Sequence, residues 1–310
     1  MNQNQFVEKF LEEINTSCFP VNDGGNKKIR EQAFLKRRFH PDNYQPRLKQ
    51  NKEIAKEIQP ETKEDWVTSI ATTCGNVVRA LVNQYGSEMK IDGVDVNSLV
   101  NGQVGKGGHW EVVYDWLHEF KFSEWLTQGN NGVWQALKAE ARADIAEISF
   151  TEVDDNSRGM TGRPRQREQI YLNRDYEMEI ELESNSDELD PNSDYYLLLL
   201  NRGQTLQGEE TKYLVCPSLV FAPHLQPVNT QFALPQPEST FEVINFDEPG
   251  TEEYLGILVR EIPNLPAWMR QTDENDLTTW DELRLYGLWQ EISQQGNYVV
   301  FYRSFEIVND

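Results

Sequence analysis

The spacing of apolar side chains changes partway along this chain of 310 residues, and that change limits the folds open to it. In the first half they recur every three or four residues, which is typical of amphipathic helices. Between Tyr176 and Glu183 they instead alternate with glutamates, which predicts a strand with one buried face and one carboxylate face. The sequence therefore predicts an α+β fold, with a helical domain followed by an antiparallel β-sandwich-like domain.

Helical periodicity defines the first domain. It covers residues 5–14, 27–39, 65–85, 110–125 and 133–148. The second of these helices should stop at His40-Pro41, because a residue that precedes proline disfavours the helical conformation. We therefore expect the helical domain to span residues 1–152.

The second domain is predicted from short strands bounded by turn residues. Besides the alternating segment, strand patterns cover residues 195–201, 213–221, 241–246, 254–260 and 298–308. Thr279 and Glu282 have the spacing of a capping box, which predicts one helix that closes an end of the sheet. Residues 153–167 are polar and lack periodicity, so we expect a linker there and the β-rich domain at 168–310.

Composition and termini limit the class of protein. The 8 Trp, 12 Tyr and 14 Phe residues exclude a disordered chain. No secretory signal opens the sequence, and no apolar run approaches the roughly 20 residues of a membrane helix. The three cysteines, Cys18, Cys74 and Cys216, lie far apart and form no metal-binding spacing. We expect a cytoplasmic protein with reduced thiols, no cofactor and no membrane partner.

Charge is divided unevenly along the chain, whose net charge is −22. Residues 1–150 carry 18 Lys+Arg and 21 Asp+Glu, whereas residues 151–310 carry 11 and 30. Within the first half lies a basic segment, residues 27–56, with ten Lys+Arg against three Asp+Glu. Surfaces of opposite charge favour association with a protein partner. The predicted partner-binding residues are Arg30, Lys36, Arg37, Arg38, His40, Asp42, Arg47 and Lys49.

One motif lies inside the basic segment. The sequence Phe39-His40-Pro41-Asp42, preceded by Lys36-Arg37-Arg38, is similar to the loop through which J-domains bind Hsp70 chaperones. A J-domain also has a further helix packed against the one before the loop. Here a polar stretch and Pro60 are expected to interrupt that helix, and Arg37 lies where the family has an apolar residue. A helix stop followed by a turn is the alternative explanation.

Nucleic-acid binding is a second interpretation of the basic segment. Clustered lysines and arginines release counterions from phosphates and give salt-dependent affinity. The acidic second half would repel a polyanion, and the segment offers few rings for base stacking. A solvated face, or a contact with an acidic protein surface, is the alternative.

A third interpretation is an enzyme that uses the helix at 110–125. Glu111, Asp115 and His118 follow i, i+4, i+7 spacing and so share one face, and His109 lies nearby. Carboxylates with an imidazole can hold a metal or act as acid and base, but the two-histidine pattern of zinc helices is missing. Because such residues also form the wet face of an amphipathic helix, we predict no catalytic residue and no metal site.

Part of the second half resembles a known family. The matching features are the strand at 195–201 followed by Arg202-Gly203, the segment at 213–218, Leu234-Pro235, and residues 249–252 ahead of the strand at 254–259. In these features residues 195–261 resemble the family called domain of unknown function 4384, which occurs in cyanobacterial multidomain proteins beside caspase-like proteases or protein kinases. The resemblance implies a sensing or docking module. We therefore expect a non-enzymatic interaction or regulatory protein, an accessory or target of a cyanobacterial signalling, stress or defence system.

Overall fold

The chain divides into two compact units, Met1–Gln128 and Gly129–Asp310, here called the helical unit and the β-rich unit. The computed structural model describes residues 4–20, 26–44, 49–62, 69–101, 109–128, 132–153, 169–183, 189, 193–228, 230–261, 265–270, 276–296 and 298–309. The predicted α+β fold is confirmed, with helices first and sheets after. The boundary between the units precedes the predicted linker, of which residues 154–167 lie outside the described residues.

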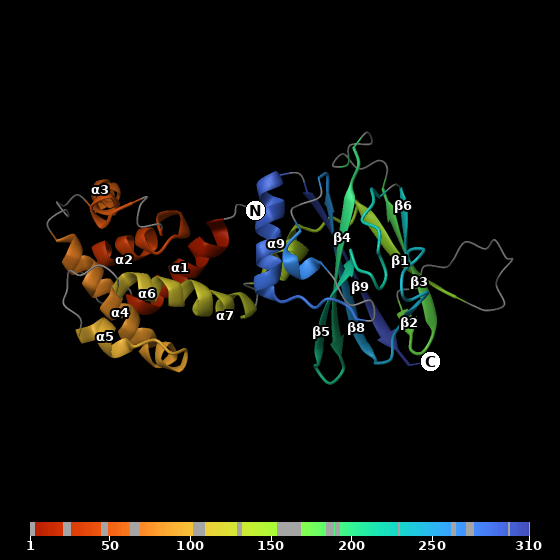
Figure 1. The fold of residues 1–310 in the computed structure, drawn as a ribbon, viewed down its shortest axis with the longest axis horizontal. Helices are drawn as coiled ribbons and strands as arrows, with labels where there is room; N and C mark the ends of the chain where they lie inside the picture. Colours follow the sequence, from red (N-terminus) through yellow and green to blue (C-terminus); the bar gives the residue numbers. More distant parts are fainter. Residues whose placement is uncertain are drawn as a thin grey trace. The chain divides into compact units, whose positions relative to one another are not determined.

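In the helical unit α2 packs against α1, α3 and α4, and α4 packs in addition against α5 and α6 (Figure 1). Its helices are α1 (Asn4–Cys18), α2 (Asn26–Arg38), α3 (Asn51–Thr62), α4 (Ile70–Ile91), α5 (Val96–Asn101), α6 (His109–Trp116) and α7 (Phe122–Thr127), with a 3-10 turn η1 (Pro41–Asn43) and a π-helical turn η2 (Leu117–Lys121). Helix α3 contradicts the expectation that polar residues and Pro60 interrupt this stretch. It forms because Ile54, Ala55 and Ile58 share one face and are fully buried.

The β-rich unit contains two sheets. Its strands are β1 (Ala146–Glu152), β2 (Gln169–Tyr171), β3 (Asp175–Leu182), β4 (Tyr196–Thr205), β5 (Glu210–Cys216), β6 (Gln231–Leu234), β7 (Ile244–Asn245), β8 (Gly250–Val259) and β9 (Tyr298–Val308). One sheet has the order β1-β3-β6, with β7 also paired to β3, and the other has the order β2-β9-β8-β4-β5. Only the pairing of β2 with β9 is parallel among these described strands. In β3 the apolar residues are buried as the alternation predicts.

One hydrophobic core fills the space between the two sheets. Phe150 of β1 lies edge-on to Phe305 of β9, with ring centroids 5.0 Å apart, and also contacts the ring of Tyr254 of β8. Met178 of β3 is fully buried in the same core. Because both sheets supply rings and aliphatic side chains to it, the sandwich-like arrangement expected from the strand pattern is present.

Two helices lie against the five-stranded sheet. Helix α8 (Val133–Glu140) and helix α9 (Glu282–Gln295) pack on each other and on β9. The sequence predicted a single helix over residues 133–148, but this helix ends at Glu140 and the chain then enters β1. Tertiary pairing overrides local helical periodicity here, since β1 runs antiparallel to β3 from Ala146↔Leu182 to Glu152↔Tyr176.

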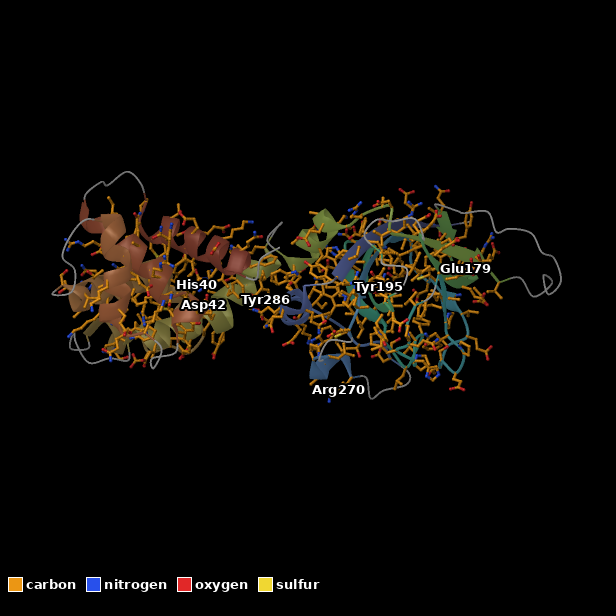
Figure 2. All side chains as sticks on the ribbon, turned by 90° about the horizontal axis from the view of Figure 1, so that it is seen from above. His40, Asp42, Glu179, Tyr195, Arg270 and Tyr286 are labelled. Carbon is orange, nitrogen blue, oxygen red and sulfur yellow. The ribbon has the colours of Figure 1, made fainter. Side chains whose placement is uncertain are left out.

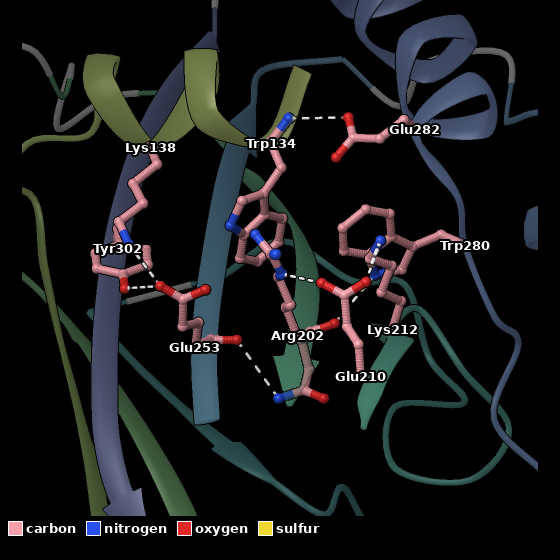
Figure 3. A network of polar contacts seen from close by, with 10 residues as sticks. Trp134, Lys138, Arg202, Glu210, Lys212, Glu253, Trp280, Glu282 and Tyr302 are labelled. Carbon is pink, nitrogen blue, oxygen red and sulfur yellow. Dashed lines mark hydrogen bonds and ion pairs between the residues drawn. The ribbon is translucent and has the colours of Figure 1, made fainter. Parts of the chain in front are cut away.

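The start of α9 also differs from its prediction. The N-cap is Asp281, whose carboxylate accepts a hydrogen bond from the Arg284 backbone at 2.8 Å, so the capping box from Thr279 is wrong. Glu282 instead reaches another helix, where its carboxylate accepts a hydrogen bond from the Val133 backbone at 2.8 Å. It also accepts one from the Trp134 backbone at 3.4 Å (Figure 3). The acidic residue near this helix start therefore caps α8 rather than its own helix.

Within the described parts of the chain, no helix combines the length and the apolar content that crossing a bilayer requires.

Candidate protein-interaction site

An exposed turn follows α2. Because Pro41 cannot continue the helix, the chain turns at His40 into η1. The Nδ1 atom of His40 accepts a hydrogen bond from the Asp42 backbone at 3.3 Å and lies 3.5 Å from the Asp42 carboxylate. The Asp42 side chain is 68% exposed and that of His40 is 14% exposed, and the two lie close together in Figure 2. The turn thus places one carboxylate in solvent beside a mostly covered imidazole.

Buried and hydrogen-bonded residues on both sides of the turn hold it in place. Phe39 is fully buried, and the Asn43 side chain donates a hydrogen bond to the Arg37 carbonyl at 2.8 Å. The Tyr44 ring stacks on Tyr114 of α6, with centroids 3.7 Å apart. The Tyr44 hydroxyl donates a hydrogen bond to Asp115, which raises the pKa of Tyr44 to about 12. Both flanks of the turn are therefore anchored.

His118 of η2 supplies a further anchor. Its Nε2 atom lies 2.9 Å from the Phe39 carbonyl, and its ring centroid lies 4.2 Å from that of Tyr114. Burial lowers the pKa of His118 below its ordinary value of 6.5. The ring is consequently neutral at physiological pH and donates from Nε2 to the carbonyl. We call Tyr44, Tyr114, Asp115 and His118 the turn brace.

The turn brace shows what the predicted stripe of carboxylates and imidazole on this helix face does. The spacing correctly places Asp115 and His118 on one helix face, but both side chains hold the turn. Among the described residues no group of three or more His, Cys, Asp and Glu side chains is arranged to hold a metal ion. Sequence reasoning missed the tyrosines, although Tyr114 lies four residues before His118 and so shares its face.

Arg38 corrects the predicted interaction surface. It is 2% exposed, and its guanidinium carbon lies 3.5 Å above the centroid of the Trp110 ring. One of its terminal nitrogens donates a hydrogen bond to the Lys49 carbonyl at 2.9 Å. Arg38 is therefore part of the core of the helical unit and cannot contact a partner. Its guanidinium instead makes a cation–π contact with the Trp110 ring.

The other predicted basic residues have different surroundings. Lys36 forms an ion pair with Glu12, and Lys49 forms one with Glu57 at 2.8 Å. Arg30 is half-buried, with one nitrogen 3.4 Å from the Ser69 hydroxyl, whereas Arg37 is exposed. Arg47 and the side chains of Lys27 and Lys28 lie outside the described residues. Two of the predicted lysines, Lys36 and Lys49, are thus paired with acidic residues within the helical unit.

The β-rich unit carries its own polar network on the sheet face under α8 and α9 (Figure 3). Lys138 of α8 pairs with Glu253 of β8 at 2.5 Å, and the Tyr302 hydroxyl donates to the same carboxylate. Arg202 and Lys212 both pair with Glu210, at 2.5 Å and 2.7 Å. These pairs lower the pKa values of Glu210 and Glu253 despite partial burial. The network attaches helix to sheet and pairs neighbouring strands.

Comparison of the chain with protein-family models, with curated proteins and with solved structures gave no match. The resemblance of residues 195–261 to the domain of unknown function 4384 therefore stays a prediction.

Proposed function

We propose that this chain is a non-enzymatic interaction protein whose helical unit binds a partner protein through the turn at His40 to Asp42 and the exposed end of α2. The observation that carries the proposal is the contrast at this turn. Asp42 projects into solvent, while Phe39, Asn43 and Tyr44 on either side of it are held by buried or stacked contacts.

Rigid presentation of an exposed charged group favours binding. A loop that is already ordered loses less conformational entropy on association. Asp42 and Arg37 also give the surface one negative and one positive group for a partner of complementary charge. Catalysis by the stripe on α6 is disfavoured, because Asp115 and His118 are already hydrogen-bonded to the turn.

Charge variants of the full chain test this proposal. We expect Asp42→Asn and Arg37→Glu each to lose the same bound protein in quantitative pull-downs from a bacterial lysate, at low salt. Lys56→Glu is the matched control, since it reverses an exposed charge that lies on α3 and belongs neither to the turn nor to α2. If all three variants retain the same proteins as the parent chain, the turn does not bind the partner.

A Hsp70-type chaperone is a second, more specific candidate partner. It is favoured by the order of the elements, since a helix, the Phe39-His40-Pro41-Asp42 turn and a second helix packed on the first are all present. We expect the full chain to stimulate the ATPase of a bacterial Hsp70, and Asp42→Asn to abolish the effect. If the chain neither stimulates nor binds the Hsp70, the chaperone is not its partner. The broader proposal of a protein partner is then tested by the pull-down alone.

The basic segment also suggested nucleic-acid binding. With Arg38 buried and Lys36 and Lys49 paired, we expect the full chain to show no salt-dependent binding of DNA or RNA in a titration. Salt-sensitive binding that is lost on Arg37→Glu would favour nucleic acid over protein. The proposed setting, a cyanobacterial signalling, stress or defence system, rests on the resemblance of residues 195–261.

A further inference from the structure

The β-rich unit contains a cavity of about 360 Å³ that the proposed function does not use. It lies beside the end of β4, along β5 from its beginning and beside the beginning of β8, and residues 244–248 line another side. Its volume falls within the range of small-molecule sites, roughly 300–1,000 Å³. The cavity is therefore large enough for a small organic ligand.

The charge of the lining has one sign. Four carboxylates contribute to it, from Glu209, Asp247, Glu248 and Glu252, and the described lining includes no Lys, Arg or His. Three of these acids are exposed and lie in loops, whereas Glu252 lies within β8 on the face turned toward the core. A cation is the ligand that such a field concentrates.

Glu252 differs from the neighbouring carboxylates because its hydrogen-bond partner carries no charge. Its only hydrogen bond among the described residues comes from the neutral Asn201 side chain, at 2.6 Å. Glu253, the next residue, is paired with Lys138, and Glu210 is paired with two cations. Glu252 is thus a partly buried acid without a basic partner in the described structure, which is costly unless a ligand supplies one.

Tyr254 gives an independent indication of a ligand. It is 4% exposed and lines the cavity, yet its hydroxyl has no hydrogen-bond partner among the described residues. Its ring is fixed against Phe150 and Phe305. Burial and the charge of Glu252 both raise the pKa of Tyr254, so the hydroxyl keeps its proton. The hydroxyl is not among the fully buried polar atoms that lack a partner, so it reaches open space, where a molecule bound in the cavity can form a hydrogen bond with it.

The space around the Glu252 carboxylate depends on a glycine. A Cβ atom on Gly203 would lie 2.7 Å from Glu252 Oε1 and 2.5 Å from the Thr211 hydroxyl. The absence of a side chain at Gly203 therefore leaves room for the carboxylate in the cavity. Tyr213, Phe221 and Phe246 add further aromatic surface to the lining.

We propose that this cavity binds an alkylammonium group, with Glu252 as its counter-ion, the Tyr254 hydroxyl as a hydrogen-bond acceptor and the aromatic rings against the alkyl chain. An ammonium carries three donors and is attracted to aromatic faces as well as to carboxylates. No arrangement of three potential metal ligands occurs among the described residues, so an organic cation suits the site better than a metal ion. The group could belong to a free amine or to a lysine side chain.

Calorimetric titration of the full chain tests the proposal. The probes are putrescine, N-acetyl-lysine methylamide and, as the uncharged counterpart, 1,4-butanediol, all at one ionic strength. We expect both amines to bind and the diol not to bind, and the tighter amine indicates the natural source. Glu252→Gln should weaken amine binding by tenfold or more, because it removes the counter-ion, and Tyr254→Phe should weaken it less.

Glu177→Gln is the matched control, since it removes an exposed carboxylate of β3 that does not line the cavity. If Glu177→Gln and Glu252→Gln weaken amine binding equally, the proposal is overturned, because the amines are then attracted only by the net charge of the chain. Binding of the diol as tightly as putrescine would also overturn it. Asp42→Asn should leave amine binding unchanged, so this experiment is separate from the test of the turn.

Stability provides a second measurement. Burial raises the pKa of Glu252, so without a ligand its ionised form is less favourable in the folded chain than in the unfolded chain. Above the unfolded pKa, Glu252→Gln should therefore raise the melting temperature, while the amide oxygen still accepts from Asn201. The same variant should lose the rise in melting temperature that putrescine causes in the parent chain. A lower melting temperature, or a retained response to putrescine, would contradict the proposal.

Discussion

Arg38 shows how burial changes the meaning of a charged residue. Its stem and guanidinium are enclosed beside Trp110, so truncation removes packing, a cation–π contact and the hydrogen bond to Lys49. We expect Arg38→Ala to lower the unfolding free energy of the helical unit by about 2–4 kcal/mol. Chemical unfolding of the full chain measures this, with Arg37→Ala as the exposed neighbour expected to change it by less than about 0.5 kcal/mol. Equal effects of the two changes would place Arg38 at the surface.

His118 makes the helical unit sensitive to acid. Because burial lowers its pKa, although Asp115 and the Phe39 carbonyl act in the opposite direction, the unfolded chain takes up the proton first as pH falls below 6.5. The unfolding free energy should therefore decrease from that pH downward until the folded pKa is passed. His40, which lowers the same pKa, strengthens the effect.

The non-titrating variant His118→Gln isolates this contribution, because its amide can still donate to the Phe39 carbonyl. Melting temperatures measured between about pH 7 and pH 5 should fall more steeply for the parent chain than for the variant. Parallel curves would show that His118 does not cause the acid sensitivity.

At the scale of the element, α8 depends on a cap supplied by α9. The Glu282 carboxylate accepts from the Val133 backbone, and a Cβ on Gly132 would lie 2.8 Å from that carboxylate. Gly132→Ala should displace it and lower stability by about 1–2 kcal/mol. Gly287→Ala in α9 is the matched control, since its Cβ would meet nothing within 4 Å and should stabilise by about 0.5–1 kcal/mol. Thermal unfolding distinguishes the two by sign.

Elements whose pattern is set locally could be predicted from sequence. The alternation in β3 was sufficient, because one face is buried and the other is not. The helix predicted over residues 133–148 wrongly includes the first three residues of β1, since their strand conformation comes from pairing with β3 some thirty positions away. The role of Glu282 could not be predicted for the same reason. It caps a helix that lies far from it in sequence, whereas capping rules consider only residues near the start of the same helix.

At the scale of the whole molecule, the boundary between units predicts which fragments fold. A fragment of residues 129–310 should unfold cooperatively, because it keeps β1 and α8. A fragment that begins at residue 168, after the predicted linker, lacks Ile148 and Phe150 of the core and should be poorly folded. Circular dichroism with urea unfolding compares them. Equal stability of the two fragments would show that β1 is dispensable.

The candidate interaction site was predictable only in part. The turn at His40 and Asp42 follows from Pro41 and the preceding helix, and the Asp42 side chain is exposed there, while its role in binding stays a prediction. The burial of Arg38 was not predictable, because a run of three basic residues does not say which one faces Trp110. The cavity beside Glu252 could not be predicted either, since strands distant in sequence form it.

The long-range cap on α8 has a consequence for synthesis on the ribosome. The helical unit is complete in sequence once residue 128 has left the exit tunnel, and domains commonly fold in that order. Helix α8 follows immediately, but Glu282 lies 149 positions downstream of Val133, and the Val300 carbonyl that binds the Arg142 backbone emerges later still. Helix α8 and the segment after it therefore stay without these partners until residue 300 has been made.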